Sequence, residues 1–412
     1  MGDRAVDCAR LESVCAERHR GFESPPIRGL FCFDRQKSLA FLPLLRIKRR
    51  LLQILHMKNK ISLLLTASIV CAVCAPALTQ AQYQTQNNNY GVSGGNVNDA
   101  TRSFCCSGTL GSLVKDSSNV LYILSNNHVL ARQDQASVGE DISQPGLIDN
   151  GCRIPPIVAD FTSAVHLGNN VDCAIAQLRA GTMNTAGAIQ GLNGSNSGVQ
   201  PSTTALNGAV GMAVQKSGRT TGHTTGTIGS VNTSVNVQYQ KNCGSGKKTT
   251  ISYQGQYVIN SSSFSAGGDS GSLILTNTSC AHPVALLFAG SSSDTIGNPI
   301  NEVMAKMSTA LGRTLSFVGT NCTGPASPQF GAQSFQLPQQ ALDRANTVLD
   351  QNRQDLMSRP GVIGVGLGAL EDNSAPAVVV YVDKTSQVKP QVADQIDNVP
   401  VRIIMTDPFI AY

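Results

Sequence analysis

Short apolar runs separated by turn-forming residues make up the middle of the chain, from Phe104 to about Phe317. Most runs have the length of one β-strand, and several are bounded by Asn, Gly or Ser, as in VLYILSN, GAVGMAV, GQYVI and PVALLFAG. Runs of this length with turn residues at their ends predict strands rather than helices. Because many such strands follow one another, we predict an all-β barrel or sandwich here.

The pattern changes after residue 319. The stretch TNCTGPASPQFGAQ has the composition of a linker, which we place at 319–333. QQALDRANTVLDQNRQDLM then contains good helix formers throughout, and Pro360 marks its end. GVIGVGLGAL and APAVVVYVDK are strand-like, and a short PQVADQIDN helix and a VPVRIIM strand are expected to follow. We therefore predict a small α/β domain over residues 334–412.

The first part of the chain carries the pattern of an export signal. A basic start at Met57, an apolar run and then small residues predict a secretory signal peptide over 57–81, and hence a secreted or periplasmic protein. The apolar run is short for a membrane span, so no stable span is expected. Residues 1–56 show no periodic pattern, and we interpret them as a non-native upstream extension. The alternative is a signal anchor with a short inner tail. Residues 82–102 are polar and rich in Gly and Asn, which predicts a flexible N-terminus.

Charge narrows the class of protein. Only 14% of the residues are charged, Trp is absent, and turn formers are plentiful, which is typical of an externally exposed all-β protein. The net charge is +5, but the excess lies largely in the first part of the chain, with IKRR at 47–50. Beyond residue 80 no run of Lys and Arg resembles a nucleic-acid footprint, so nucleic-acid binding is not expected.

The cysteines also indicate an oxidising environment. The chain has 12 cysteines, and those beyond residue 80 are Cys105, Cys106, Cys152, Cys173, Cys243, Cys280 and Cys322. In an exported protein this group predicts disulfides. Its number is odd, so at least one thiol stays free or pairs between chains, and Cys173 within the apolar VDCAIA run is the expected buried free thiol. The mature region contains no CxxC or Cys/His cluster, so neither a metal nor a cofactor is expected.

Three short segments carry the chemistry: SNNHVL around His128, VDCAIA around Asp172 and GGDSGS around Ser270. A serine hydroxyl becomes a nucleophile only when a neighbouring base takes its proton, and a third group must orient that base. A carboxylate at the start of an apolar strand needs a partner if it is buried, and an imidazole N–H would supply one. The alternative is a surface strand cap. Asp160, in VADF, is the second choice for the carboxylate.

The glycines around Ser270 allow the chain to bend tightly and to point backbone N–H groups outward. We predict that the N–H groups of Gly268 and Ser270 form an oxyanion hole. A glycine-rich turn without chemistry is the alternative. The order of the residues argues against this alternative, because the histidine and the carboxylate precede this serine as one arrangement of the catalytic triad requires.

These segments resemble the chymotrypsin-like (trypsin-fold) serine proteases. KSGRTTGHTTGTIGS at 216–230 is similar to a stretch of the α-lytic protease and streptogrisin group, and SNNHVLAR with VALLFAGSSSDTIGNPI looks closer to bacterial trypsin-like proteins related to the plant NARROW LEAF proteins. The resemblance covers residues 103–318. It implies two six-stranded antiparallel β-barrels with the triad between them, in which His128 is the general base, Asp172 the orienting carboxylate and Ser270 the nucleophile.

The resemblance also implies a substrate pocket, with its floor near Phe264 and its walls at Ala289, Gly290 and Ser291. Trypsin-like enzymes that cut after basic residues carry an acid at the position of Phe264, so an apolar or shallow pocket is expected. His223 is interpreted as a solvent-facing loop residue. The sequence shows no IVGG-type new N-terminus, so Asp269 needs another partner if it is buried, and Lys216 or Arg219 could provide it.

The sequence therefore predicts an exported serine endopeptidase that hydrolyses polypeptides through an acyl-enzyme. The alternative is a protease-like module that binds peptides with little or no turnover. A third possibility is that the 334–412 domain covers the cleft and restrains activity. The oligomeric state does not follow from the sequence.

Overall fold

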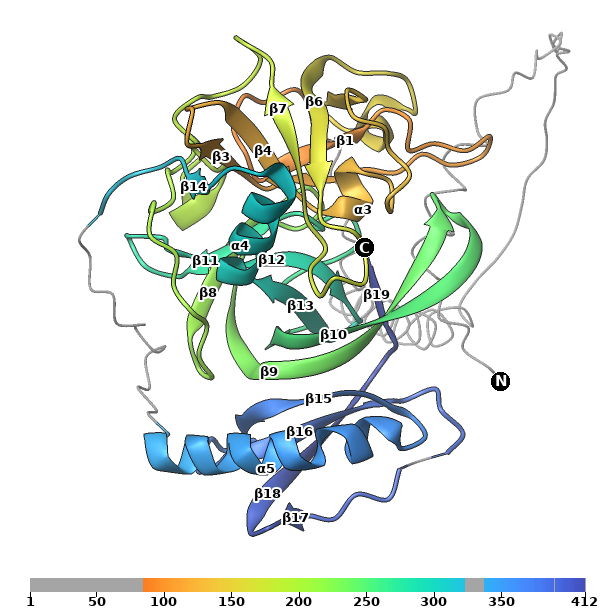
Figure 1. Cartoon of the computed structure of the whole chain (residues 1–412), viewed down its shortest axis with the longest axis vertical. Helices are drawn as coiled ribbons and strands as arrows, with labels where there is room; N and C mark the ends of the chain where they lie inside the picture. Colours follow the sequence, from red (N-terminus) through yellow and green to blue (C-terminus); the bar gives the residue numbers. More distant parts are fainter. Residues whose placement is uncertain (1–83, 323–336, 389, 412) are drawn as a thin grey trace, which may run out of the picture. The chain divides into compact units, whose positions relative to one another are not determined.

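The computed structural model describes residues 84–322, 337–388 and 390–411. The predicted upstream extension, the signal peptide and most of the predicted linker lie outside these described residues. Strands predominate, and the helices are α3 (Asn127–Leu130), α4 (Ile300–Leu311) and α5 (Gln339–Ser358) (Figure 1). Within the described ranges, no helix is both long enough and apolar enough to pass through a membrane.

The first barrel is built from antiparallel strands on the N-terminal side of the described chain. They are β1 (Val92–Asn96), β2 (Gly108–Leu110), β3 (Ser112–Asp116), β4 (Leu121–Ser125), β5 (Asp141–Ser143), β6 (Ile157–Ala164) and β7 (Ala174–Leu178). They pair in the order β3-β4-β7-β6-β5-β1-β2. Only Gly111 separates β2 from β3, so these two act as one interrupted strand and the sheet closes into a six-stranded barrel. Strand β14 (Leu315–Phe317) pairs with β3.

The second barrel is also closed. Its strands are β8 (Ala213–Gly218), β9 (Gly222–Asn242), β10 (Ser245–Asn260), β11 (Leu273–Thr276), β12 (Pro283–Gly290) and β13 (Asp294–Pro299). Antiparallel pairing runs β8-β9-β10-β13-β12-β11 and returns to β8. The predicted all-β fold with two six-stranded antiparallel barrels of trypsin-like type is thus confirmed.

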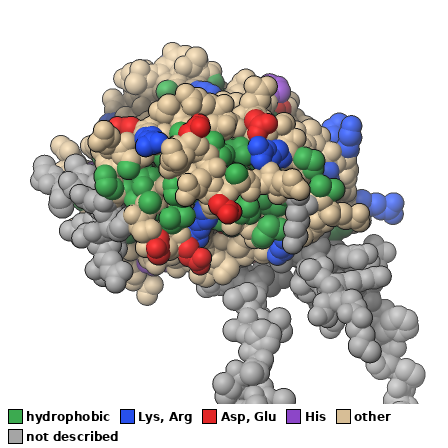
Figure 2. All heavy atoms as spheres, turned by 90° about the horizontal axis from the view of Figure 1, so that it is seen from below, with side chains coloured by type: hydrophobic (Ala, Val, Ile, Leu, Met, Phe, Trp, Pro, Cys, Tyr) green, Lys and Arg blue, Asp and Glu red, His purple; other side chains and the backbone are tan. Residues whose placement is uncertain are grey.

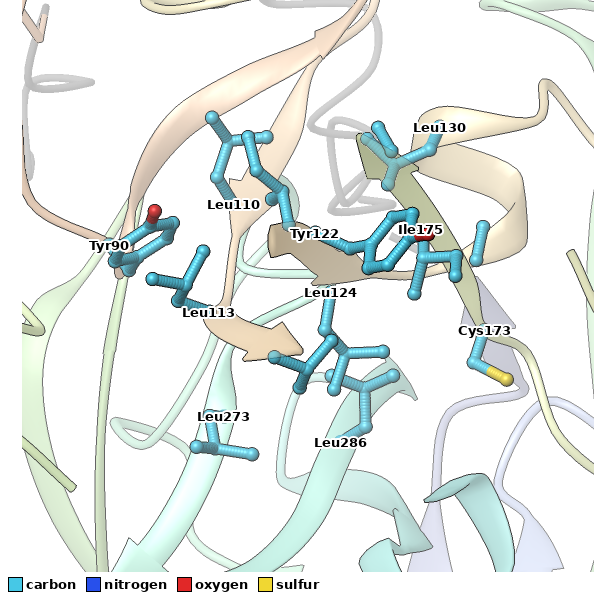
Figure 3. Close-up of a cluster of buried hydrophobic side chains, with 14 of the residues drawn as sticks. Tyr90, Leu110, Leu113, Tyr122, Leu124, Leu130, Cys173, Ile175, Leu273 and Leu286 are labelled. Atoms are coloured by element: carbon cyan, nitrogen blue, oxygen red, sulfur yellow. The ribbon is translucent and has the colours of Figure 1, made fainter. Parts of the chain in front are cut away.

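Buried apolar side chains join the two barrels. The cluster in Figure 3 includes Leu110, Leu124 and Ile175 from the first barrel and Leu273 and Leu286 from the second. Each is at most 1% exposed. Since burying a side chain of this size contributes about 1.5–3 kcal/mol, this shared cluster stabilises the arrangement of the barrels around the site.

The polar N-terminal segment is ordered where it enters the first barrel, so the prediction of a flexible N-terminus over 82–102 is wrong for its central part. Tyr90 is fully buried, and β1 pairs with both β2 and β5. The buried polar side chains find partners on other segments: Asn96 donates through Nδ2 to the carbonyl of Leu130 at 2.8 Å. Because the fold satisfies these polar groups, a polar composition here does not produce disorder.

The C-terminal segment is attached to the second barrel. It contains α5, β15 (Val362–Ala369), β16 (Pro376–Asp383), β17 (Gln395–Ile396), β18 (Val399–Thr406) and β19 (Phe409–Ala411). Strand β15 pairs antiparallel with β9, so the sheet of the second barrel continues into β15, β16 and β18. Helix α5 packs on β15 and β16 through an apolar face that includes Leu349 and Leu356. The surface at this end mixes hydrophobic side chains with charges of both signs (Figure 2).

The predicted PQVADQIDN helix is not formed. This stretch contains the short strand β17, which pairs antiparallel with β18. Asp397 and Asn398 connect the two strands with positive φ angles of 48° and 60°. Asn and Asp tolerate this conformation and favour tight hairpin turns, which here outweighs the helical composition of the stretch.

Six of the cysteines in the described region form three disulfides, and the seventh is free. The pairs are Cys105–Cys152, Cys106–Cys243 and Cys280–Cys322. Cys173 is buried as a thiol, as predicted. Burial raises the pKa of the Cys173 thiol, which keeps it protonated and unreactive.

Candidate active site

His128 and Asp172 meet in the first barrel. Helix α3 begins directly after β4 and carries His128, whereas Asp172 lies just before β7. His128 Nδ1 is 2.6 Å from Asp172 Oδ2, and the backbone N–H of His128 donates to Asp172 Oδ1 at 3.1 Å. In neutral imidazole a proton on Nδ1 leaves Nε2 as a proton acceptor, so this pairing sets the tautomer that a general base requires.

Asp160, the second choice for the carboxylate, lies elsewhere. Its Oδ1 is 2.6 Å from Nη2 of Arg179, which also contacts Asp141 at 2.7 Å. This ion pair is partly exposed and belongs to the outside of the first barrel. Of the two carboxylates proposed from the sequence, only Asp172 contacts His128.

Two tyrosines from the second barrel complete the surroundings of Asp172. The hydroxyl of Tyr239 on β9 donates to Asp172 Oδ2 at 2.8 Å, and the hydroxyl of Tyr253 on β10 bonds to that of Tyr239 at 2.7 Å. Because Tyr239 has one proton and gives it to the carboxylate, Tyr253 must be the donor to Tyr239. Burial and the charge of Asp172 raise the pKa of Tyr239, which therefore remains a neutral donor. Sequence reasoning missed both residues, because neither stands in a recognisable motif.

Ser270 lies on the turn before β11. Its hydroxyl donates to the carbonyl of Phe288 at 3.2 Å, and its carbonyl accepts the N–H of Thr109 at 2.8 Å. A Cβ at Gly108 would lie 2.5 Å from a methyl group of Val129 and 2.9 Å from the Ser270 carbonyl. Val129, which follows His128, and the carbonyl of Ser270 thus both border Gly108. The segment that carries His128 therefore lies close to the turn that carries Ser270. Ser270 is fully buried.

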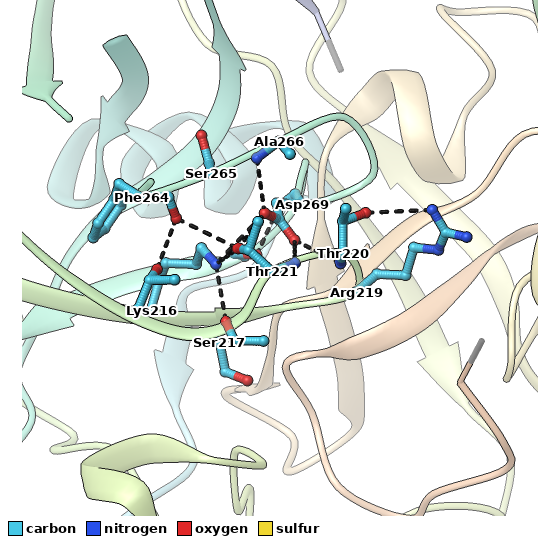
Figure 4. A network of polar contacts seen from close by, with 12 residues as sticks. Lys216, Ser217, Arg219, Thr220, Thr221, Phe264, Ser265, Ala266 and Asp269 are labelled. Carbon is cyan, nitrogen blue, oxygen red and sulfur yellow. Dashed lines mark hydrogen bonds and ion pairs between the residues drawn. The ribbon is translucent and has the colours of Figure 1, made fainter. Parts of the chain in front are cut away.

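A buried ionic network holds the turn that carries Ser270 (Figure 4). Lys216 Nζ is 3.5 Å from Asp269 Oδ2, and both side chains are fully buried. Asp269 also accepts the N–H groups of Thr220 at 2.8 Å and Ala266 at 3.0 Å, together with the hydroxyl of Thr221 at 2.7 Å. Of the two cations that the sequence offered to Asp269, the structure pairs Lys216 with it.

Arg219, the other candidate, pairs with a different acid. Its Nε and Nη2 each donate to the carboxylate of Asp149 at 3.0 Å. This pair connects the start of the second barrel to the first, since Asp149 lies in the 3-10 helix η1 (Leu147–Asn150).

Gly268 gives the turn its shape. Its φ is +95°, a conformation that residues with a Cβ rarely adopt, and its carbonyl accepts the Thr109 hydroxyl at 3.0 Å. Among the described residues, no acceptor takes the N–H of Gly268 or of Ser270. Two such unpaired donors on one turn could stabilise a developing negative charge.

The four predicted pocket residues do not gather around one open pocket. Phe264 is fully buried in the core of the second barrel, in a different apolar cluster from Ala289. Ala289 and Gly290 pair with β19, and the hydroxyl of Ser291 contacts that of Thr406 at 2.7 Å. The predicted pocket walls are therefore covered by the C-terminal segment, which the sequence alone could not reveal.

His223 also differs from the expectation. It is half-buried on β9, with Nε2 3.0 Å from Oε1 of Gln215, rather than facing solvent from a loop. Burial and the nearby charge of Lys216 lower its pKa, so the ring is neutral near pH 7.

One group of metal-ligand residue types occurs in the described ranges: donor atoms of Cys280, His282 and Cys322 lie within 4.8 Å of one another. Cys280 and Cys322 form a disulfide, which removes the thiolates that a metal would bind. This group does not fit a metal centre.

The chain matches no protein-family model and no curated protein. Similar solved structures include a glutamic acid specific serine protease, with 21% identity over 55% of this chain and 98% of that chain and a TM-score of 0.39. Thermobifida fusca Protease A is 19% identical over 57% of this chain and 99% of its own, with a TM-score of 0.38. Cellulomonas bogoriensis chymotrypsin is 21% identical over 57% and 99%, with a TM-score of 0.37. These likenesses are distant, and the trypsin-like fold is defined by the strand pairing of this chain.

Proposed function

We propose that this chain is an exported serine endopeptidase that cleaves polypeptides through an acyl-enzyme. The observation that carries the proposal is the buried 2.6 Å contact between His128 Nδ1 and Asp172 Oδ2, next to the turn that bears Ser270. A carboxylate held against Nδ1 serves to orient an imidazole and to stabilise its charged form. The three disulfides support export, since such bonds persist in oxidising compartments.

In this mechanism Nε2 of His128 takes the hydroxyl proton of Ser270 while Oγ attacks the peptide carbonyl. The oxyanion is stabilised by the N–H groups of Gly268 and Ser270, and Asp172 stabilises the imidazolium. The imidazolium then gives its proton to the leaving amine, and water hydrolyses the ester in the reverse sequence of proton transfers. The hydroxyl of Ser270, which donates to Phe288, has to rotate towards His128 before the attack.

We also propose a relation to the bacterial proteins similar to plant NARROW LEAF proteins, on the strength of the SNNHVLAR and VALLFAGSSSDTIGNPI segments. The protease domain would comprise about residues 103–318, extended by β1 on its N-terminal side. A second candidate function is a peptide-binding module with little turnover. Complete burial of Ser270 favours it, because substrate must reach the nucleophile.

The test is labelling of the purified protein, starting at about Gln82, with a fluorophosphonate, followed by peptide mass spectrometry. We expect the label on Ser270, and we expect it to be lost on denaturation and in His128→Ala. Ser262→Ala replaces an exposed serine of the same loop and should leave labelling unchanged. A folded protein that binds peptides but is never labelled would support the binding module instead.

A further inference from the structure

The short C-terminal strand β19 lies on the edge of β12 beside Ser270. Ile410 is opposite Gly290 and Ala411 is opposite Ala289, in antiparallel register. Going from Ile410 to Ala411, the strand advances towards Phe288, whose carbonyl accepts the hydroxyl of Ser270. Strand β19 thus approaches the nucleophile with its carbonyl end leading, as the acyl half of a cleaved peptide must.

The strand is inserted between two elements of the second barrel. On its other side Phe409 and Ile410 pair in parallel with Val237 and Gln238 of β9. An added strand satisfies the unpaired backbone groups of a sheet edge, which is the usual way in which extended peptides bind to sheets.

Side chains on this strand alternate between the protein interior and solvent. Phe409 is fully buried, in an apolar cluster that includes Val237, Tyr253 and Phe288, whereas Ile410 is 40% exposed. The ring of Tyr381 meets that of Phe409 edge-on, with centroids 5.8 Å apart. One aromatic side chain therefore anchors the segment next to Ala289 and Gly290, two of the predicted walls of the substrate pocket.

A set of polar contacts fastens the chain just before β19. The Thr406 hydroxyl donates to Asp294 Oδ2 at 2.6 Å and contacts the Ser291 hydroxyl at 2.7 Å. The carboxylate of Asp407 accepts the hydroxyl of Ser292 and pairs with Lys384 at 2.9 Å. These contacts hold the chain before Phe409 to the β12–β13 loop, to the start of β13 and to Lys384, whereas the backbone pairing of Ile410 and Ala411 with β12 holds the chain after it.

We propose that β19 is a built-in peptide ligand that occupies the acyl side of the cleft, and that a substrate polypeptide must displace it. This inference rests on the proposed function. The displacing substrate would be an extended peptide with a large apolar side chain that fills the site of Phe409 and backbone groups that pair with Ala289 and Gly290. Because β19 belongs to the same chain, its effective concentration at the cleft is high. It can therefore occupy the cleft even if its intrinsic affinity for this site is weak.

This arrangement has a defined kinetic signature. Substrate binds only the fraction of molecules in which β19 has left the edge, so the apparent KM is raised by the inverse of that fraction. The step after binding is unaffected, so kcat stays the same. A change that weakens the anchoring of β19 should therefore lower KM without changing kcat.

The first experiment compares Phe409→Ala with the unaltered chain in the hydrolysis of an extended peptide. We expect KM to fall at least tenfold while kcat stays within twofold. Ile403→Ala removes an exposed side chain on β18 and serves as the matched control, with KM unchanged. Asp407→Asn loosens the polar fastening without touching the apolar cluster, and should lower KM by a smaller factor. An unchanged or higher KM in both Phe409→Ala and Asp407→Asn, with both variants folded, would overturn the inference.

The second experiment does not depend on hydrolysis. A dye-labelled peptide TDPFIA, the sequence of residues 406–411, is titrated by fluorescence anisotropy against both proteins carrying Ser270→Ala. We expect the peptide to bind the protein with Phe409→Ala at least tenfold more tightly than the protein that retains Phe409. If the peptide binds in this way but no version of the chain hydrolyses peptides, the proposed function fails and β19 remains a ligand of the edge. If it binds neither protein although the chain is an active protease, the inference is wrong.

Discussion

Replacing Lys216 by Met should destabilise the fold strongly, because it leaves the buried Asp269 without its cation. The two side chains are fully buried, and their charged atoms are 3.5 Å apart. Removing one member of a buried ion pair typically costs about 3–5 kcal/mol, since the remaining charge has lost its compensation. Lys216 Nζ also donates to the carbonyl of Gly222 at 2.9 Å, and the loss of that bond adds about 1 kcal/mol.

The expected loss is large compared with the stability of a whole domain. Ordinary domains have a free energy of unfolding of about 5–15 kcal/mol, so the substitution should remove a large part of it. The assay is urea unfolding without reductant, followed by far-ultraviolet circular dichroism, because the chain contains no Trp. The slope of free energy against urea should stay the same while the midpoint falls.

A matched control and a double variant complete this experiment. Lys306→Met breaks a partly exposed pair with Glu302 (2.8 Å) and should cost less than about 1 kcal/mol. In Lys216→Met combined with Asp269→Asn, the loss should be smaller than the sum of the two single losses, because no full charge remains buried. A Lys216→Met variant within about 1 kcal/mol of the unaltered chain would refute the assignment of Lys216 as the partner of Asp269.

Three further changes have specific expected outcomes. Tyr239→Phe removes the hydroxyl donor to Asp172, so peptide hydrolysis should fall about tenfold in kcat while urea unfolding shows a loss of about 1–3 kcal/mol; unchanged kinetics would mean that the hydroxyl has no part in orienting the carboxylate. Gly271→Ala places a Cβ against the Ser125 hydroxyl and requires a strained φ of +93°, so fluorophosphonate labelling should be lost, and normal labelling would contradict this geometry. Burial acts to raise the pKa of Glu140, but the hydrogen bonds that its carboxylate accepts, chiefly from Arg132, outweigh burial and hold this pKa at about 2. The resulting stabilisation is present above the unfolded pKa of about 4.5 and is lost as the pH falls towards 2, and Glu140→Gln should flatten this part of a stability-against-pH curve.

Local sequence was sufficient to predict the barrel strands and to single out Ser270 and Asp172 as candidate site residues. Short apolar runs bounded by turn residues predict strands because a buried strand is only about four to eight residues long, whereas a helix needs a longer periodic stretch. The glycines around Ser270 stand out because glycine destabilises regular structure, so a cluster of them indicates a special backbone conformation. Asp172 stands out because burying a carboxylate without a partner is unfavourable. The α5 helix was predictable as well, since its composition and Pro360 act within the segment itself.

Tertiary structure decided which distant residues meet. From the sequence, both Asp172 and Asp160 were candidate partners for His128. The folded first barrel places Asp172 against His128 and Asp160 against Arg179. The sequence also left two cations for Asp269, and the path of β8 and β9 brings Lys216 to it. The hydrogen bond from Tyr239 to Asp172 was likewise not predictable from local sequence, because it joins residues of different barrels.

At both ends of the described chain, too, tertiary structure decided what the local sequence could not. Residues 90–96 look disordered by composition, yet they form part of the first barrel because β2 and β5 supply their hydrogen-bond partners. Strand β19 carries no local signal that would direct it to β12. A strand is stable only when a neighbouring strand takes up its backbone groups, and the choice of that neighbour depends on how the whole chain is folded.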